Sequence, residues 1–189
     1  MATDRLAACW LLTLAGLRRS EVLGLRWADV DHDAGTITIA QGRVVISGGT
    51  AAGAPKSARS ARTLPMPPDV LAALRAFKTR QAEEHLAIGG DWPDTGLVAV
   101  NADGSPIRPE TYSKAFAAQC VAAGVPVIRL HGVRHTAATM LRDGGTTPSA
   151  TAKWLGHDPA ITLRVYGHVY DDALASAGDA GRSRANGDD

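Results

Sequence analysis

Residues 16–27 read Gly-Leu-Arg-Arg-Ser-Glu-Val-Leu-Gly-Leu-Arg-Trp and follow an apolar segment with helical spacing. That spacing predicts a helix over residues 3–15, which Gly16 ends. Ser20 is a residue type that caps helix N-termini, so we expect a second helix over residues 21–25. Arg18 would then lie in the turn between the two helices.

The apolar period changes after this pair of helices. Alternation typical of strands runs through residues 36–39, 44–46 and 62–66, with a Gly/Ala-rich loop before the last of them. Helical patterning returns and predicts helices at residues 67–86, 109–123, 131–143, 147–155, 161–166 and 171–176. The sequence therefore predicts an α+β fold, mainly α-helical, with a small three-stranded antiparallel sheet.

Composition narrows the class of protein without naming a function. The 189 residues suit one domain, and 20 basic residues against 19 acidic ones leave a net charge of +1. Any DNA site must then come from local clustering of charge. The apolar run over residues 6–17 is too short to cross a bilayer, and Cys9 and Cys120 lack a disulfide pattern. We expect a cytoplasmic protein with both cysteines reduced and buried.

A set of cationic side chains precedes Tyr166 in the sequence. It comprises Arg18, Lys56, His131, Arg134 and His157. Guanidinium, ammonium and imidazole groups can hold a phosphodiester and neutralise charge as it builds, while a phenol oxygen attacks the phosphorus. This combination points to DNA strand cleavage through a covalent phosphotyrosine.

Five stretches together resemble the catalytic domain of the tyrosine recombinase, or phage integrase, family. They are residues 16–27, Pro-Lys-Ser at 55–57 with Arg-Thr-Leu-Pro-Met-Pro at 62–67, His-Gly-Val-Arg-His-Thr-Ala at 131–137, Leu-Gly-His at 155–157, and residues 162–168 around Tyr166. Each is weak alone, but their order and spacing match the family over nearly the whole chain. The resemblance implies one catalytic domain at residues 1–176 without the N-terminal core-binding domain. The composition of residues 177–189, mostly Gly, Asp, Ser, Ala and Arg, predicts a flexible tail.

The resemblance also implies a role for each reactive residue. Arg18 and Arg134 would hold the non-bridging phosphate oxygens, and Lys56 would protonate the departing 5′ oxygen. His131 would assist proton transfer from Tyr166, and His157 would donate a hydrogen bond to the phosphate. Without this pattern, Arg18 and Lys56 would be read as solvated loop residues.

Two further residues are expected to orient the catalytic side chains without contacting the DNA. Glu21 resembles a carboxylate that fixes the orientation of an arginine or histidine, with a helix-start acid as the alternative. His135 lies one turn after His131 and is expected to be a buried hydrogen-bonding residue.

Tyr112 and Tyr170 compete with Tyr166 for the role of nucleophile, but both are interpreted as packing residues.

A zinc helix is the rival interpretation of His131 and His135, because they stand at i and i+4. The H-E-x-x-H motif needs a glutamate after the first histidine, and Gly132 stands there. No phosphate-binding glycine loop or carboxylate triad is present either. We therefore expect no metal, ATP or other cofactor.

The implied reaction is strand exchange without hydrolysis. Tyr166 would form a 3′-phosphotyrosyl link and release a 5′ hydroxyl, which attacks the equivalent link on another duplex. The family resemblance implies double-stranded DNA as partner, a tetramer on DNA, and an integrase of a phage or mobile element. A chromosome-dimer-resolving recombinase, a type IB topoisomerase and a non-catalytic DNA-binding remnant stay open as alternatives.

Overall fold

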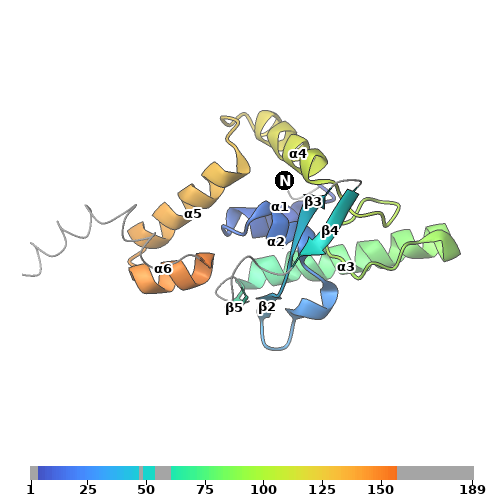
Figure 1. Cartoon of the computed structure of the whole chain (residues 1–189), viewed down its shortest axis with the longest axis horizontal. Coiled ribbons are helices and arrows are strands. Elements are labelled where there is room, and N and C mark those ends of the chain that lie inside the picture. Colours follow the sequence, from blue (N-terminus) through green and yellow to red (C-terminus); the bar gives the residue numbers. More distant parts are fainter. Residues whose placement is uncertain (1–3, 47–48, 54–60, 157–189) are drawn as a thin grey trace, which may run out of the picture.

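The computed structural model describes residues 4–46, 49–53 and 61–156. In chain order its elements are α1 (Ala7–Leu14), α2 (Arg19–Gly24), the 3-10 turn η1 (Trp27–Asp29), β1 (Val30–Asp31), β2 (Thr36–Ile39), β3 (Gly42–Ile46), β4 (Gly49–Gly53), β5 (Arg62–Pro65), α3 (Pro68–Ile88), the 3-10 turn η3 (Gly89–Asp91), α4 (Pro109–Ala122), α5 (Leu130–Asp143) and α6 (Pro148–Leu155). Figure 1 shows helices around a small β region. The predicted α+β class is confirmed.

The second helix begins earlier than the sequence predicted. Its N-cap is Arg18, in extended conformation, and not Ser20. The backbone N–H of Arg18 donates to Glu21 Oε2 over 2.8 Å, so the Glu21 carboxylate caps the helix two residues before Ser20. Arg18 therefore lies at the N-terminus of α2, and its side chain is 34% exposed.

The three-stranded sheet is present, but one of its members differs from the prediction. Its order is β1-β2-β5, all antiparallel, with Ile37 opposite Leu64. Residues 44–46 instead belong to β3, which pairs with β4 in a separate hairpin. The strand β4 has the sequence Gly-Thr-Ala-Ala-Gly, a composition depleted in strands, so its pattern had indicated a loop.

The core is built around α1, which lies between α3 and α4 (Figure 1). Trp10 is 1% exposed, and its ring lies 4.7 Å from that of Tyr112 and 5.9 Å from that of Phe116. Cys9 and Cys120 are both buried and free, as predicted. Tyr112, one of the alternative nucleophiles, is buried with its hydroxyl hydrogen-bonded to the Cys9 carbonyl and to Thr13, so it is a packing residue.

The later helices agree with the sequence to within about two residues at each end. Thr147 caps α6 by accepting the Ala150 N–H, and α6 ends at Gly156 in the left-handed region, with φ of +61°. Among the described residues, no helix is long and apolar enough to span a membrane. The helices expected at residues 161–166 and 171–176, and the tail at 177–189, lie outside the described residues.

Candidate active site

Three arginines face a single buried carboxylate, that of Glu21. Arg18 Nη1 lies 2.7 Å from Oε1, Arg62 Nη1 lies 2.9 Å from Oε1, and Arg134 Nη1 lies 3.9 Å from Oε2. The side chains of Arg62 and Arg134 are each 5% exposed, against 34% for Arg18. Three guanidiniums and one carboxylate leave two positive charges in excess, with Arg18 nearest to solvent.

The same three arginines hold three successive carbonyl groups at the end of α6. Arg62 Nε donates to the Trp154 oxygen over 2.7 Å, and Arg18 Nη2 donates to the Gly156 oxygen over 2.9 Å. Arg134 Nη2 donates to the Leu155 oxygen between them. The last carbonyls of a helix lack partners within the helix and carry its negative dipole end, so cations suit this position.

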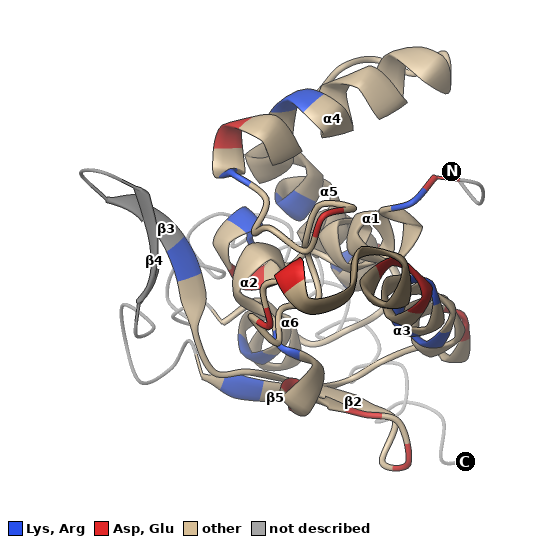
Figure 2. Cartoon of the chain, turned by 90° about the vertical axis from the view of Figure 1, so that its right-hand side faces the viewer, with Lys and Arg blue, Asp and Glu red and all other residues tan. Residues whose placement is uncertain are grey.

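These elements meet because α6 packs against both α5 and β5 (Figure 2). Gly16, just before α2, allows the approach: a Cβ there would lie 2.9 Å from Leu155 Cδ2 and 3.0 Å from Ala137 Cβ. Its carbonyl oxygen accepts a hydrogen bond of 2.7 Å from Arg134 Nη1. The turn at residues 16–18 is therefore fixed against α5 and α6.

The environment of the cluster alters two ionisable groups. Burial alone would raise the pKa of Glu21, but the hydrogen bonds and charge of Arg62, and then those of Arg18, outweigh it and hold the pKa below its ordinary value. Burial, followed by repulsion from Arg18, lowers the pKa of Arg134 to about 9. Both groups are charged at neutral pH, so the cluster keeps its excess of positive charge.

The structure thus brings together Arg18, Glu21 and Arg134, as the sequence predicted. His131 lies on α5 three residues before Arg134 and is exposed. His135 was expected to be buried, and that expectation is wrong: it is exposed, with its ring 4.8 Å from the His131 ring. The reason is that positions 131 and 135 share the outer face of α5, while Val133 and Arg134 face inward.

Three predicted site residues, Lys56, His157 and Tyr166, lie outside the described residues, as does Tyr170. Their roles stay predictions. Leu155 and Gly156, the residues before His157, are held by Arg134 and Arg18. Within residues 4–46, 49–53 and 61–156, no group of three His, Cys, Asp or Glu side chains gathers that could hold a metal ion.

Arg62 is the member of the cluster that sequence reasoning missed. Residues 62–67 belong to one of the motifs that resemble the family, but the resemblance assigns no role to Arg62. Alternation along β5 carried the signal, because Arg62 shares a face with Leu64 and Met66, while Thr63 and Pro65 are exposed. A charged residue in register with buried apolar ones indicates a buried ionic partner.

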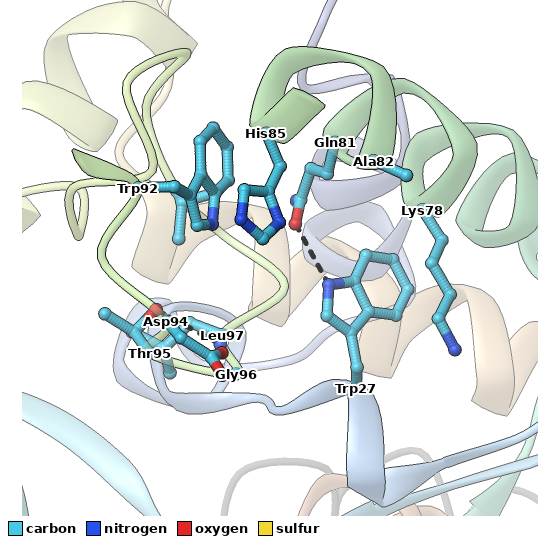
Figure 3. A pocket seen from close by; sticks show the side chains of 11 residues that line it. Trp27, Lys78, Gln81, Ala82, His85, Trp92, Asp94, Thr95, Gly96 and Leu97 are labelled. Atoms are coloured by element: carbon cyan, nitrogen blue, oxygen red, sulfur yellow. Dashed lines mark hydrogen bonds between the residues drawn. The ribbon is translucent and has the colours of Figure 1, made fainter. Parts of the chain in front are cut away.

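A pocket of about 170 Å³ lies elsewhere, between α3 and the segment before α4 (Figure 3). The Trp27 indole donates to Gln81 across it, and the His85 ring is stacked 5.3 Å from that of Trp92. None of the predicted site residues lines this pocket. It is therefore separate from the arginine cluster.

Comparison with known proteins places the chain in a family. Residues 1–173 match the model of the phage integrase family. A XerC-like tyrosine recombinase of Caldanaerobacter subterraneus is 32% identical over an alignment of 179 residues that covers 87% of this chain and 46% of the relative. The ICEBs1 integrase of Bacillus subtilis is 28% identical over 158 residues, 83% of this chain and 43% of the relative.

A solved structure gives the same result. The integrase of transposon Tn1549, in complex with transposon right end DNA, has a TM-score of 0.73 at 25% identity, covering 91% of this chain and 57% of that chain. The fold is therefore that of a tyrosine recombinase catalytic domain. With the match over residues 1–173, the chain belongs to the phage integrase family. It spans about half the length of the curated relatives it matches.

Proposed function

We propose that this chain carries the catalytic centre of a site-specific DNA recombinase that cleaves and rejoins strands through a 3′-phosphotyrosyl intermediate, without metal or ATP. The observation that supports this most directly is the buried arginine cluster around Glu21 at the end of α6. Its excess positive charge suits a phosphodiester, whose charge grows as the transition state forms. The family match supplies the reaction type.

Each step of the proposed reaction has a residue assigned to it. Arg18 and Arg134 stabilise the non-bridging oxygens, because a guanidinium pairs two oxygens and stays charged at neutral pH. Tyr166 attacks the phosphorus, and its proton passes to His131. Lys56 protonates the departing 5′ oxygen, and His157 donates a hydrogen bond to the phosphate.

The bond changes balance without an external energy source. One P–O bond forms to the Tyr166 oxygen while the P–O bond to the 5′ oxygen breaks, and the proton lost by tyrosine is matched by the proton gained by the leaving group. Attack by a 5′ hydroxyl on the phosphotyrosine reverses these changes on the new strand. Because phosphodiester character is kept throughout, resealing needs no ATP.

The proposed partners follow from this reaction. Double-stranded DNA is the substrate, and the DNA complex of the Tn1549 integrase supports that choice. Four protomers would assemble on two recombining sites, with residues 171–176 of each reaching a neighbour through Leu174. Bacterial and phage relatives favour a cytoplasmic location for this reaction.

Integration of a phage or mobile element is the leading biological role. A chromosome-dimer-resolving recombinase is the second candidate, because the XerC-like relative is 32% identical whereas the ICEBs1 integrase is 28% identical. Both candidates use the same chemistry, and the target sites would separate them. A non-catalytic DNA-binding remnant is the candidate that chemistry can exclude.

The deciding experiment is incubation with a suicide DNA duplex nicked near the cleavage point, in the presence of EDTA. We expect a denaturation-resistant protein–DNA adduct that Tyr166→Phe abolishes. Tyr170→Phe is the matched control and should keep the adduct. Absence of an adduct both here and in a longer chain to which an N-terminal core-binding domain is joined would favour the remnant and defeat the proposal.

A further inference from the structure

We propose that Arg62 is a positioning residue for the proposed strand cleavage: it orients Glu21 and, at the same time, holds the end of α6. The inference rests on the function proposed above, and it concerns a residue that the reaction itself does not use. All three guanidinium nitrogens of Arg62 face Glu21 or the Trp154 carbonyl, so we assign it to holding the cluster together and not to the DNA phosphate.

The first contact of Arg62 is a two-pronged bridge to Glu21. Nη1 donates to Oε1 over 2.9 Å and Nη2 donates to Oε2 over 3.1 Å. Two parallel hydrogen bonds set the plane of the carboxylate as well as its distance. Oε1 also accepts from Arg18 Nη1 over 2.7 Å, so the plane that Arg62 imposes determines where the Arg18 guanidinium lies.

The second contact joins Arg62 to the carbonyl end of α6. Nε donates to the Trp154 oxygen over 2.7 Å, and this carbonyl precedes those held by Arg134 and Arg18. Gly156 packs directly on the guanidinium: a Cβ at that position would lie 2.8 Å from Nη1. Arg62 therefore fixes the position of the C-terminal end of α6, directly before His157 in the sequence.

Only a guanidinium can make both contacts at once. Its Nε and two terminal nitrogens point along fixed directions in one plane, whereas a lysine ammonium is a single compact donor group. A lysine at position 62 would keep the charge next to Glu21 and lose the geometry. The Arg62→Lys substitution therefore separates positioning from charge.

The test compares Arg62→Lys with Arg75→Lys, a matched control on the exposed face of α3. Three quantities are measured for each variant: the titration of the Glu21 carboxyl by carbon-13 NMR, the affinity for the suicide duplex, and the single-turnover rate of adduct formation. For Arg62→Lys we expect a higher Glu21 titration midpoint, duplex affinity within about threefold, and a rate lowered about 10- to 100-fold. The control should match the wild type in all three.

A second variant covers the case in which Arg62→Lys does not fold. Gly156→Ala keeps the Arg62 side chain but crowds its Nη1, so the rate of adduct formation per folded molecule should also fall. A rate loss that follows the unfolded fraction alone would assign Arg62 a structural role and overturn the inference. An unchanged Glu21 titration in folded Arg62→Lys would overturn it as well.

The two proposals fail in different ways. If neither the wild-type chain nor the longer chain forms an adduct but Arg62→Lys still shifts the Glu21 titration, the recombinase activity is defeated while the positioning of Glu21 by Arg62 stands. If the wild type forms an adduct and Arg62→Lys forms it at the same rate, the activity stands and the positioning is defeated.

Discussion

Glu21 is the residue on which the geometry of the cluster depends. All three arginines lie within 4 Å of its carboxylate, and its Oε2 also accepts the Arg18 backbone N–H. One buried anion therefore both starts α2 and balances charges brought from β5 and α5. Without it, three guanidiniums would face one another in a site with little water.

Replacing Glu21 by Gln should destabilise the fold strongly. The amide keeps the size of the side chain but removes the negative charge, and breaking a buried ionic contact from one side typically costs about 3–5 kcal/mol. Denaturation with urea measures the free energy of unfolding. Glu83→Gln, on the exposed face of α3, should change it by less than about 0.5 kcal/mol. Equal effects of the two substitutions would show that the cluster contributes little to stability.

The pH dependence of stability follows from the lowered pKa of Glu21. A carboxyl whose folded pKa lies below its unfolded value of 4.5 stabilises the fold above that value, and this contribution is lost as pH falls through the folded pKa. We expect stability to decline below about pH 4.5 in the wild type. Glu84 also has a lowered pKa, because Arg5 and Arg80 pair with it, and it acts in the same direction.

The contribution of Glu21 is therefore measured as a difference. Urea denaturation at several pH values should show a smaller acid decline for Glu21→Gln than for the wild type. Parallel curves for the two proteins would contradict the assigned pKa direction.

At the residue scale, sequence reasoning recovered the residue types but not every contact. Arg18, Glu21 and Arg134 were predicted because residue type and motif position agree. Arg62 was missed because its own partner, Glu21, is 41 residues away in sequence. The prediction that His135 is buried was wrong. Helical spacing places His135 beside His131, but it does not show which face of α5 packs against the rest of the protein.

At the scale of elements, the C-terminus of α6 is the junction of the site. Its last carbonyls are held by the side chains of Arg18, Arg62 and Arg134, and Gly156 ends the helix in the left-handed region. A helix end held at three points has little freedom to rotate. The position of residues 154–156 is thus set by tertiary contacts as well as by the helix-stop signal of the glycine.

Gly156→Ala should lower stability by more than conformational strain alone accounts for. Gly124, at φ of +67°, follows α4, and a Cβ added there would meet nothing within 4 Å, whereas a Cβ on Gly156, at φ of +61°, would press on Arg62 at 2.8 Å. Gly124→Ala should therefore cost about 1–2 kcal/mol from left-handed strain. Gly156→Ala should cost clearly more, measured as the free energy of unfolding in urea. Equal costs would mean that the Arg62 contact gives way freely.

Helix positions were predictable at this scale, while strand pairing was not. Pro109 and Thr147 mark the starts of α4 and α6 through local chemistry that a sequence displays. The partner of a strand is chosen by distant contacts. The strand β1 has only two residues, too few to show an alternating pattern. It occupies the position in the sheet that the sequence pattern predicts for residues 44–46.

For the whole molecule, the balance of charge determines how strongly DNA can be held. The net charge is +1, and basic and acidic residues are interspersed along α3 (Figure 2). The excess positive charge of the arginine cluster is local and partly buried. Because sequence-independent affinity grows with the number of neutralised phosphates, such a protein can position a scissile phosphate without binding DNA tightly.

DNA binding by this chain should accordingly be weak and only moderately dependent on salt. If three or four phosphates are neutralised, the logarithm of affinity should fall against the logarithm of salt with a slope of about −3, and Kd should lie at about 10⁻⁴–10⁻⁶ M near physiological salt. Fluorescence anisotropy with a labelled duplex measures both. Arg18→Gln should make the slope shallower by about 1, because this guanidinium is the most exposed of the cluster. Arg75→Gln, on α3, should leave the slope unchanged. Nanomolar binding with a slope near about −8 would show that DNA is held by a far larger basic surface than the cluster.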